Sequence, residues 1–167
     1  MLSTFALMFS YIYHVVEKTV ANLSKDFIDL LRLERWSNFC GDALFSGGCG
    51  RIFEGTHRQM YDSLNKLASL PKHTKVYCGH EYTLSNLKFA IEVDTENKDL
   101  LDEYNHVKKL NISKNPSLPS TLDKELKINP FLRCNNMSIR NKINKEFNVS
   151  GDDFKIFTAL REWKDNY

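Results

Sequence analysis

The stretch from Gly41 to Thr56 constrains the fold of this 167-residue chain more than any other part of its sequence. Asp42 comes directly after a glycine and before apolar residues, and four glycines fall between Gly41 and Gly50. Glycine at this density is typical of tight turns, or of main chain that a ligand approaches closely. We therefore expect a corner of turns around Asp42.

The stretch from Tyr77 to Thr83 has a matching pattern. Lys75–Cys78 is a short run typical of a strand, and it ends at Gly79, which leaves His80 exposed. An aspartate and a histidine at the ends of two strand-like runs predict one shared polar site. Taken singly, each is equally well interpreted as a loop aspartate and a hydrogen-bonded histidine.

The bulk properties of the chain set the class of protein. Its length suits one domain or two small ones, with a real core. The formal net charge is +2 and no long basic run occurs, so the sequence does not predict a nucleic-acid partner. The four cysteines show no C-x-x-C spacing, which favours reduced thiols in a cytosol-like compartment; they are Cys40, Cys49, Cys78 and Cys134.

The first forty residues differ in character from the rest. Met1–Val16 is apolar, and its β-branched and aromatic part Tyr11–Val16 favours a buried strand. A targeting or anchor segment is the alternative, but the stretch lacks a basic start and is shorter than the roughly twenty residues of a membrane helix. Thr19–Trp36 predicts a helix that Ser24 caps.

Helices dominate after the glycine-rich stretch. Thr56 and Gln59 fit a capping box, and the helix that follows ends before Pro71. With the strand Lys75–Cys78, this order is typical of an α/β layered fold. From Leu84 onward we expect only helices, joined by a connector at Asn115–Pro119; they start at Leu84 and cover Leu100–Leu110, Met137–Phe147 and Asp152–Lys164, the last capped by Ser150.

Together these stretches resemble the glyoxalase II family, the hydroxyacylglutathione hydrolases of the metallo-β-lactamase fold. The resemblance extends from about Cys40 to the end of the chain. The segments that carry it are Gly41–Phe45, Gly48–Arg51, Phe53–Thr56, Gly79–Thr83, Asn86–Ala90, Pro119–Leu122, Asn129–Arg133 and Arg161–Asp165.

The resemblance implies an α/β (α+β) fold in two parts. We expect residues 1–82 to form a truncated metallo-β-lactamase-like αββα half, divergent over residues 1–40, and residues 83–167 to form the helical C-terminal domain of the family. A half of this fold would leave the inner face of its sheet without a partner. We therefore expect an exposed apolar patch that includes Tyr11, Ile12, Val15, Leu44, Phe45 and Val76.

The resemblance also implies a zinc site. In the family, the residue matching Asp42 bridges two Zn²⁺ ions and the residue matching His80 binds the second, so both act in catalysis through the metal. The other ligands come from an H-x-H-x-D-H motif and a further histidine. None of the five histidines here forms H-x-H, so we expect the N-terminal metal-binding half to be absent. His14 fits a packed side chain better than a ligand.

The substrate side of the family site is better represented. Glutathione carries two carboxylates, which cationic side chains recognise through charge-assisted hydrogen bonds. By resemblance, Arg51, Arg161 and Lys164 take this role, although a solvated helix face is the alternative for the last two. The same pocket is lined by Phe53, His80, Tyr82 and Asn86.

The activity implied is hydrolysis of S-(2-hydroxyacyl)glutathione thioesters, typically S-D-lactoylglutathione to D-lactate and glutathione, in methylglyoxal detoxification. We expect a cytoplasmic enzyme that is a monomer when intact and has no membrane partner, with targeting by the apolar N-terminus left open. One alternative is an inactive, truncated glutathione-binding module. Another is the persulfide dioxygenase branch of the same fold, against which the helical C-terminal region and Arg161-x-x-Lys164 argue.

Overall fold

The computed structural model describes residues 37–167. The predicted strand Tyr11–Val16, the predicted helix Thr19–Trp36 and His14 lie outside the described residues. Within residues 37–167, no helix is both long enough and apolar enough to cross a membrane.

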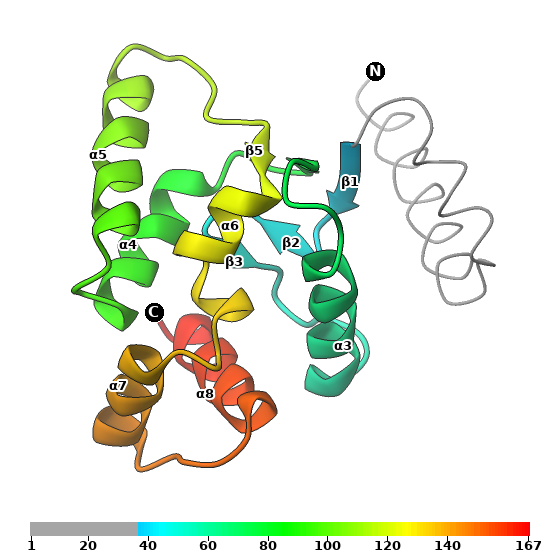
Figure 1. The fold of residues 1–167 in the computed structure, drawn as a ribbon, viewed down its shortest axis with the longest axis vertical. Helices are drawn as coiled ribbons and strands as arrows, with labels where there is room; N and C mark the ends of the chain where they lie inside the picture. Colours follow the sequence, from blue (N-terminus) through cyan, green and yellow to red (C-terminus); the bar gives the residue numbers. More distant parts are fainter. Residues whose placement is uncertain (1–36) are drawn as a thin grey trace, which may run out of the picture. The chain divides into compact units, whose positions relative to one another are not determined.

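Two small sheets organise the described residues (Figure 1). Strand β4 (Lys75–Cys78), predicted from the sequence, is the middle of a three-stranded sheet. It pairs in parallel with β1 (Ser37–Gly41) and antiparallel with β5 (Ser120–Thr121). The second sheet is the hairpin of β2 (Leu44–Phe45) and β3 (Gly48–Cys49). Because β5 comes from far along the chain, the C-terminal region completes the sheet of the N-terminal part.

Helix α3 (His57–Ala68) begins as the sequence predicts. The Thr56 hydroxyl accepts a hydrogen bond from the Gln59 amide (3.2 Å), and the Gln59 side chain accepts one from the Thr56 amide (2.8 Å). This reciprocal capping box satisfies two amides that the first turn leaves without partners.

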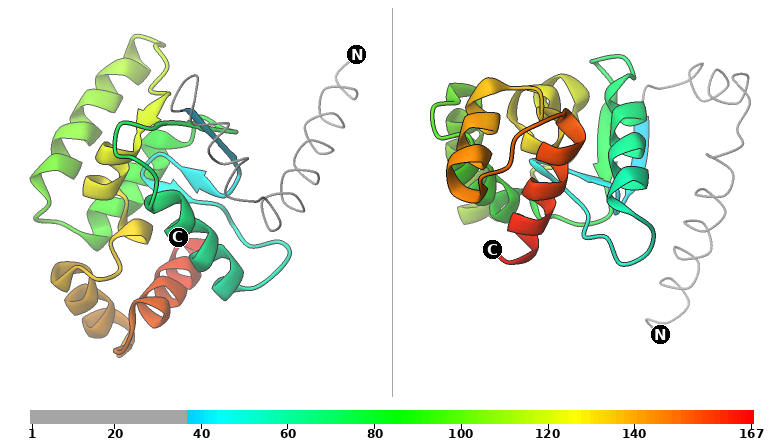
Figure 2. Two further views of the ribbon diagram at one scale, coloured as in Figure 1. Left: turned by 45° about the vertical axis from the view of Figure 1, so that its right-hand side comes forward. Right: turned by 90° about the horizontal axis from the view of Figure 1, so that it is seen from below.

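The chain from Thr83 onward is largely helical, as predicted. Helices α4 and α5 lie side by side in Figures 1 and 2, and α7 and α8 form a second neighbouring pair. The elements are α4 (Thr83–Val93), α5 (Lys98–Ile112), α6 (Leu122–Ile128), the 3₁₀ turn η1 (Pro130–Leu132), α7 (Met137–Phe147) and α8 (Asp153–Asp165).

The cap of α8 differs from the prediction. Asp152, not Ser150, precedes the helix, and its carboxylate accepts a hydrogen bond from the Lys155 amide (2.9 Å). A carboxylate at this position also interacts favourably with the positive end of the helix dipole, which a serine hydroxyl does less strongly.

The main hydrophobic core crosses the predicted boundary after residue 82. Leu44, Leu64 and Val76 pack in one cluster with residues of the later helices, including Phe89 and Phe157. The protein is therefore a mixed α/β structure with a helical C-terminal region, and residues 37–167 form one compact unit. The division into domains at residue 82 stays a prediction.

The expectation of an exposed apolar patch is wrong for Leu44, Phe45 and Val76. The other residues of that patch, Tyr11, Ile12 and Val15, lie outside the described residues. Leu44, Phe45 and Val76 have exposed fractions of 0%, 6% and 1%. Helix α4 contacts β3, and η1 contacts both β3 and α8. The helices of the C-terminal region thus cover apolar side chains that we expected to lack a partner.

Candidate active site

The parallel pairing of β1 and β4 brings Asp42 and His80 to the same sheet edge. Each follows the carboxyl end of its strand, and the Gly79 amide donates to the Gly41 carbonyl (2.9 Å) beyond the last paired residues. The Asp42 Oδ1 atom lies 3.7 Å from His80 Nε2, and the two side chains are 58% and 54% exposed. The predicted juxtaposition of an aspartate and a histidine is present in the structure.

Gly79 makes this close approach possible. A Cβ atom at this position would lie 2.7 Å from Asp42 Oδ1, closer than carbon and oxygen normally come. Any other residue would require the Asp42 carboxylate to shift. The glycine before the histidine therefore permits the observed Asp42–His80 geometry.

Aromatic rings fix the orientation of His80. The His80 ring stacks on Tyr82 with centroids 4.9 Å apart and an interplanar angle of 15°. Phe45, from β2, lies 5.3 Å from the Tyr82 ring and 6.2 Å from the His80 ring, centroid to centroid. The imidazole thus has apolar support on one side, while its Nε2 atom faces Asp42.

Asp42 and His80 fit as part of a metal shell. Two donor atoms that each lie about 2.0–2.2 Å from one Zn²⁺ are at most about 4.4 Å apart, and the observed separation is 3.7 Å. A catalytic zinc ion normally takes three protein ligands. Within residues 37–167, no group of three or more His, Cys, Asp or Glu side chains is arranged to hold a metal ion.

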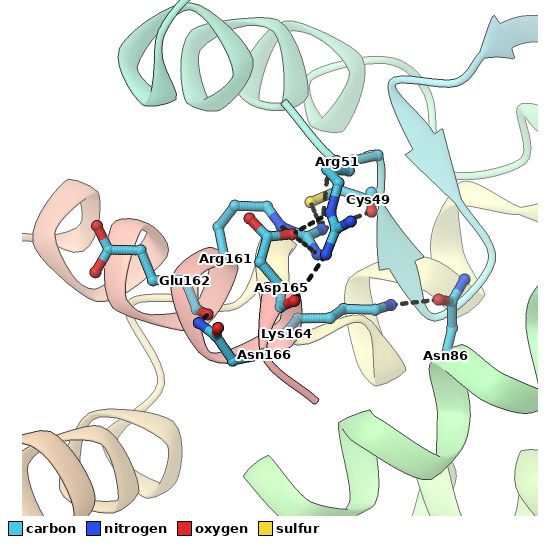
Figure 3. Close-up of polar contacts among 9 residues, drawn as sticks. Cys49, Arg51, Asn86, Arg161, Glu162, Lys164, Asp165 and Asn166 are labelled. Atoms are coloured by element: carbon cyan, nitrogen blue, oxygen red, sulfur yellow. Dashed lines mark hydrogen bonds and ion pairs between the residues drawn. The ribbon is translucent and has the colours of Figure 1, made fainter. Parts of the chain in front are cut away.

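Arg161 is buried and joins α8 to the end of β3. Its Nη1 atom donates to the carbonyls of Cys49 (2.8 Å) and Gly50 (3.2 Å), while Nε and Nη2 donate to Asp165 Oδ1 at 3.2 Å and 2.9 Å (Figure 3). Its exposed fraction is 3%. The alternative of a solvated helix face is therefore wrong for Arg161.

Asp165 also holds Arg51, which lies just after β3. The Arg51 Nε atom donates to Asp165 Oδ1 (3.2 Å), and Nη2 donates to the Asp165 carbonyl (2.7 Å). The Arg51 side chain remains 53% exposed. Sequence analysis missed Asp165 as a functional residue, although its position four residues after Arg161 was a signal for an ion pair on the helix surface.

Lys164 extends from α8 towards α4. Its ammonium donates to Asn86 Oδ1 (Figure 3), and Asn86 Nδ2 donates to the Ser46 carbonyl (3.0 Å). Burial lowers the pKa of Lys164 to about 8, and the neighbouring Arg161 guanidinium acts in the same direction. Since only one of the three ammonium hydrogens is needed for Asn86, this cation is suited to accept an anionic ligand.

The remaining predicted residue, Phe53, lies in the loop between β3 and α3 and is 86% exposed. The structure thus groups the predicted residues in two places. Asp42, His80 and Tyr82 lie at the sheet edge, whereas Arg51, Asn86, Arg161 and Lys164 lie where α8 meets the β2–β3 hairpin and α4.

The comparisons with known proteins identify the family. Residues 81–167 match the family model described as hydroxyacylglutathione hydrolase C-terminus. The chain belongs to this family. A hydroxyacylglutathione hydrolase of Shewanella denitrificans is 52% identical over 130 residues, which are 77% of this chain and 50% of the relative. One of Vibrio parahaemolyticus is 51% identical over 132 residues, 77% of this chain and 51% of the relative.

These matches confirm the family resemblance predicted from the sequence. The chain spans about half the length of these hydroxyacylglutathione hydrolases. Family membership is thus established, while the activity of a whole enzyme is a matter for proposal.

Proposed function

We propose that this chain provides the glutathione-binding part and two metal ligands of a hydroxyacylglutathione hydrolase. The reaction is hydrolysis of the thioester in S-(2-hydroxyacyl)glutathione, with S-D-lactoylglutathione as the typical substrate. The β2–β3 hairpin carries this proposal. Phe45 at one end contacts His80 and Tyr82, and Cys49 at the other end accepts a hydrogen bond from Arg161.

In this proposal Asp42 and His80 would supply two of the ligands that hold zinc. When bound, such a metal pair lowers the pKa of water and polarises a carbonyl, which suits thioester hydrolysis. By the family resemblance, the remaining ligands belong to an H-x-H-x-D-H motif and a further histidine. Tyr82 keeps the His80 ring in place through the stacked contact.

The cations around α8 bind the carboxylates of glutathione. Lys164 offers a partly buried ammonium, and Arg51 an exposed guanidinium that Asp165 orients. Arg161 adds positive charge and fixes the main chain just before Arg51 through the Cys49 and Gly50 carbonyls. Asn86, Tyr82 and Phe53 complete the lining. Charge-assisted bonds from preorganised cations are the strongest way to hold a carboxylate.

The cytoplasm is the compartment that we propose. Cys40, Cys49, Cys78 and Cys134 are all free thiols. Burial raises the pKa of Cys40 to about 12 and also raises the pKa of Cys134. Buried, protonated thiols of this kind are unreactive and are typical of proteins in a reducing environment.

The test joins this chain to the N-terminal half of the Shewanella denitrificans relative, adds zinc, and follows the loss of S-D-lactoylglutathione absorbance. We expect hydrolysis by the joined protein and two zinc ions per molecule by elemental analysis. The proposal fails if the joined protein folds and binds zinc but leaves the thioester intact.

A second candidate is a glutathione-binding module without catalysis. It is favoured by the contrast between a cation cluster that hydrogen bonds hold in place and a sheet edge with two metal ligands. Titration calorimetry of the chain alone with glutathione, together with its zinc content, separates the two candidates. Binding with well under one zinc ion per molecule, and no hydrolysis by the joined protein, would favour the module.

A further inference from the structure

Glu125 is a buried carboxyl group with no part in the proposed metal or glutathione contacts. It lies in α6 and has an exposed fraction of 0%. Its Oε1 atom accepts hydrogen bonds from the hydroxyls of Ser46 (2.8 Å) and Ser120 (2.5 Å). Its Oε2 atom accepts from the Gly47 amide (2.8 Å) and Asn129 Nδ2 (3.3 Å). These donors come from separate segments of the chain, so the buried carboxyl group holds the segments together.

The segment that Glu125 holds is the Ser46–Gly48 turn of the β2–β3 hairpin. Asn129, at the end of α6, adds bonds from Nδ2 to the carbonyls of Phe45 (3.2 Å) and Gly48 (2.9 Å). The turn is therefore attached to α6 on both of its sides. Ser120 and Asn129 belong to two of the segments that carry the family resemblance but had no assigned role.

The same turn supports Lys164 from its opposite side. The Ser46 carbonyl accepts a hydrogen bond from Asn86 Nδ2 (3.0 Å), and Asn86 Oδ1 accepts one from the Lys164 ammonium. A Cβ atom at Gly48 would lie 2.7 Å from Asn86 Cγ and 2.8 Å from Lys164 Nζ. The main chain of the turn is thus in direct contact with both side chains, and a small displacement of the turn would move them.

We propose that Glu125 is a positioning residue for the anion site, which sets the place of the Lys164 ammonium through the Ser46–Gly48 turn and Asn86. The chemical class of the ligand, a carboxylate of glutathione, rests on the proposed function. The positioning itself rests on the hydrogen bonds of the described residues. Glu125 touches neither the ligand nor Lys164, so it acts only through the residues between them.

The geometry of Glu125, rather than its charge, performs this role. Two obligate donors, the Gly47 amide and Asn129 Nδ2, converge on Oε2, while the serine hydroxyls on Oε1 can reverse and accept. A glutamine with its oxygen at the Oε2 position would satisfy every partner. Burial raises the pKa of Glu125, which is consistent with a site that does not require the ionised form.

The first test needs no ligand. Lysine ε-carbon NMR titration of the whole chain follows Lys164, whose pKa is lowered to about 8 by burial. The titratable groups that face it are Cys49, Arg161 and Asp165. In Glu125→Ala the turn loses its anchor, so Lys164 regains water and its pKa rises towards the ordinary 10.5. Removing a negative charge alone would lower that pKa. In Glu125→Gln we expect no change.

An unchanged Lys164 pKa in folded Glu125→Ala would overturn the proposal, and so would an equal rise in Glu125→Gln. If Glu125→Ala does not fold, Ser46→Ala and Ser120→Ala form a matched pair, since each removes one of the two hydroxyls that donate to Glu125 Oε1. Only Ser46 belongs to the turn. We expect a rise in the Lys164 pKa for Ser46→Ala alone, and equal behaviour of the pair would reject the positioning role.

Glutathione binding provides the second readout. We expect Glu125→Ala to weaken binding about tenfold in calorimetry at a temperature well below unfolding, and Glu125→Gln to bind like the original chain. In the Lys164→Met background, Glu125→Ala should lower glutathione affinity only slightly further, because the effects of substituting coupled residues are not additive. Full additivity would overturn the proposal. If the original chain binds no glutathione, the proposed function fails, while the lysine titration still decides the role of Glu125.

Discussion

The two parts of the candidate site are built in opposite ways. At the sheet edge, Asp42 and His80 are more than half exposed and lie 3.7 Å apart. In the cluster around α8, Asn86 and Arg161 are 4% and 3% exposed, and each is held by several hydrogen bonds. The sheet edge presents exposed ligand atoms to a metal that must be supplied, whereas the cluster around α8 is held in place by the protein itself.

This difference separates chemistry from stability. Changes at the sheet edge should affect catalysis in a whole enzyme and leave folding unaffected, because the side chains there support little of the structure. Substitutions in the cluster around α8 should affect folding and glutathione binding together. The predictions below test this separation, from the largest effect to the smallest.

The largest effect is expected for Asp42→Ala in the joined, zinc-loaded protein. Loss of the bridging carboxylate should lower thioester hydrolysis by more than about 10²-fold, since even residues behind metal ligands matter 10- to 100-fold. The melting temperature of the chain alone should not change, because Asp42 is exposed. Asp123→Ala, an exposed aspartate of α6, is the matched control and should retain activity. Residual activity above about a tenth would place catalysis elsewhere.

Arg161→Met should cause the largest loss of stability. It leaves the carbonyls of Cys49 and Gly50 and the Asp165 carboxylate without their buried donor. Breaking a buried charged pair in this way costs about 3 kcal/mol. Chemical denaturation should show this loss in the free energy of unfolding.

Arg51→Met is the matched control for that prediction, because Arg51 binds the same Asp165 from an exposed position. It should change the free energy of unfolding by about 0.5 kcal/mol or less, while glutathione affinity falls. Equal destabilisation by both substitutions would contradict the distinction between a buried structural arginine and an exposed ligand-binding one.

The next effect in size is a pH dependence of glutathione binding. Burial lowers the pKa of Lys164 to about 8, so the ammonium is present below this pH and is lost above it. A carboxylate ligand favours the charged form. Affinity for S-methylglutathione should therefore fall about tenfold as the pH rises through 8. A tenfold loss is about what one charge-assisted hydrogen bond contributes to binding. In the Lys164→Met variant, any remaining pH dependence of affinity comes from titration of the ligand itself. If this variant and the original chain have identical pH profiles, Lys164 is excluded from the site.

Local signals in the sequence explain which parts of the fold could be predicted. The Thr56–Gln59 capping box, the strand Lys75–Cys78 and the helix Met137–Phe147 depend on neighbouring residues, and all are present as predicted. Strand β5 and helix α6 were not predicted. Two residues suffice for β5 because β4 supplies its hydrogen-bond partners, and no local pattern encodes such a contact.

The candidate site likewise contains some residues that sequence motifs predict and others that only the structure reveals. Asp42 and His80 followed from their motifs, and the structure brings them together. Glu125 and Asp165 did not, because each directly follows a lysine on a helix, and such a carboxylate is typical of a solvated surface. Their roles depend on donors from distant segments, Ser46 and Gly47 for one and Arg51 for the other. Only the three-dimensional structure shows that these segments meet.

The smallest expected effect is a gain in affinity from Phe53→Tyr. Phe53 is 86% exposed in the loop after Arg51. A tyrosine there adds a donor beside the glutathione carboxylates without disturbing any packed contact. One neutral hydrogen bond contributes about 0.5–1.5 kcal/mol, so calorimetry should show glutathione affinity rising about two- to tenfold with an unchanged melting temperature. Phe53→Leu keeps the apolar character without the hydroxyl and should show no gain. If Phe53→Tyr and Phe53→Leu bind glutathione equally, the loop does not reach the ligand, and the glutathione site is confined to the cluster around α8.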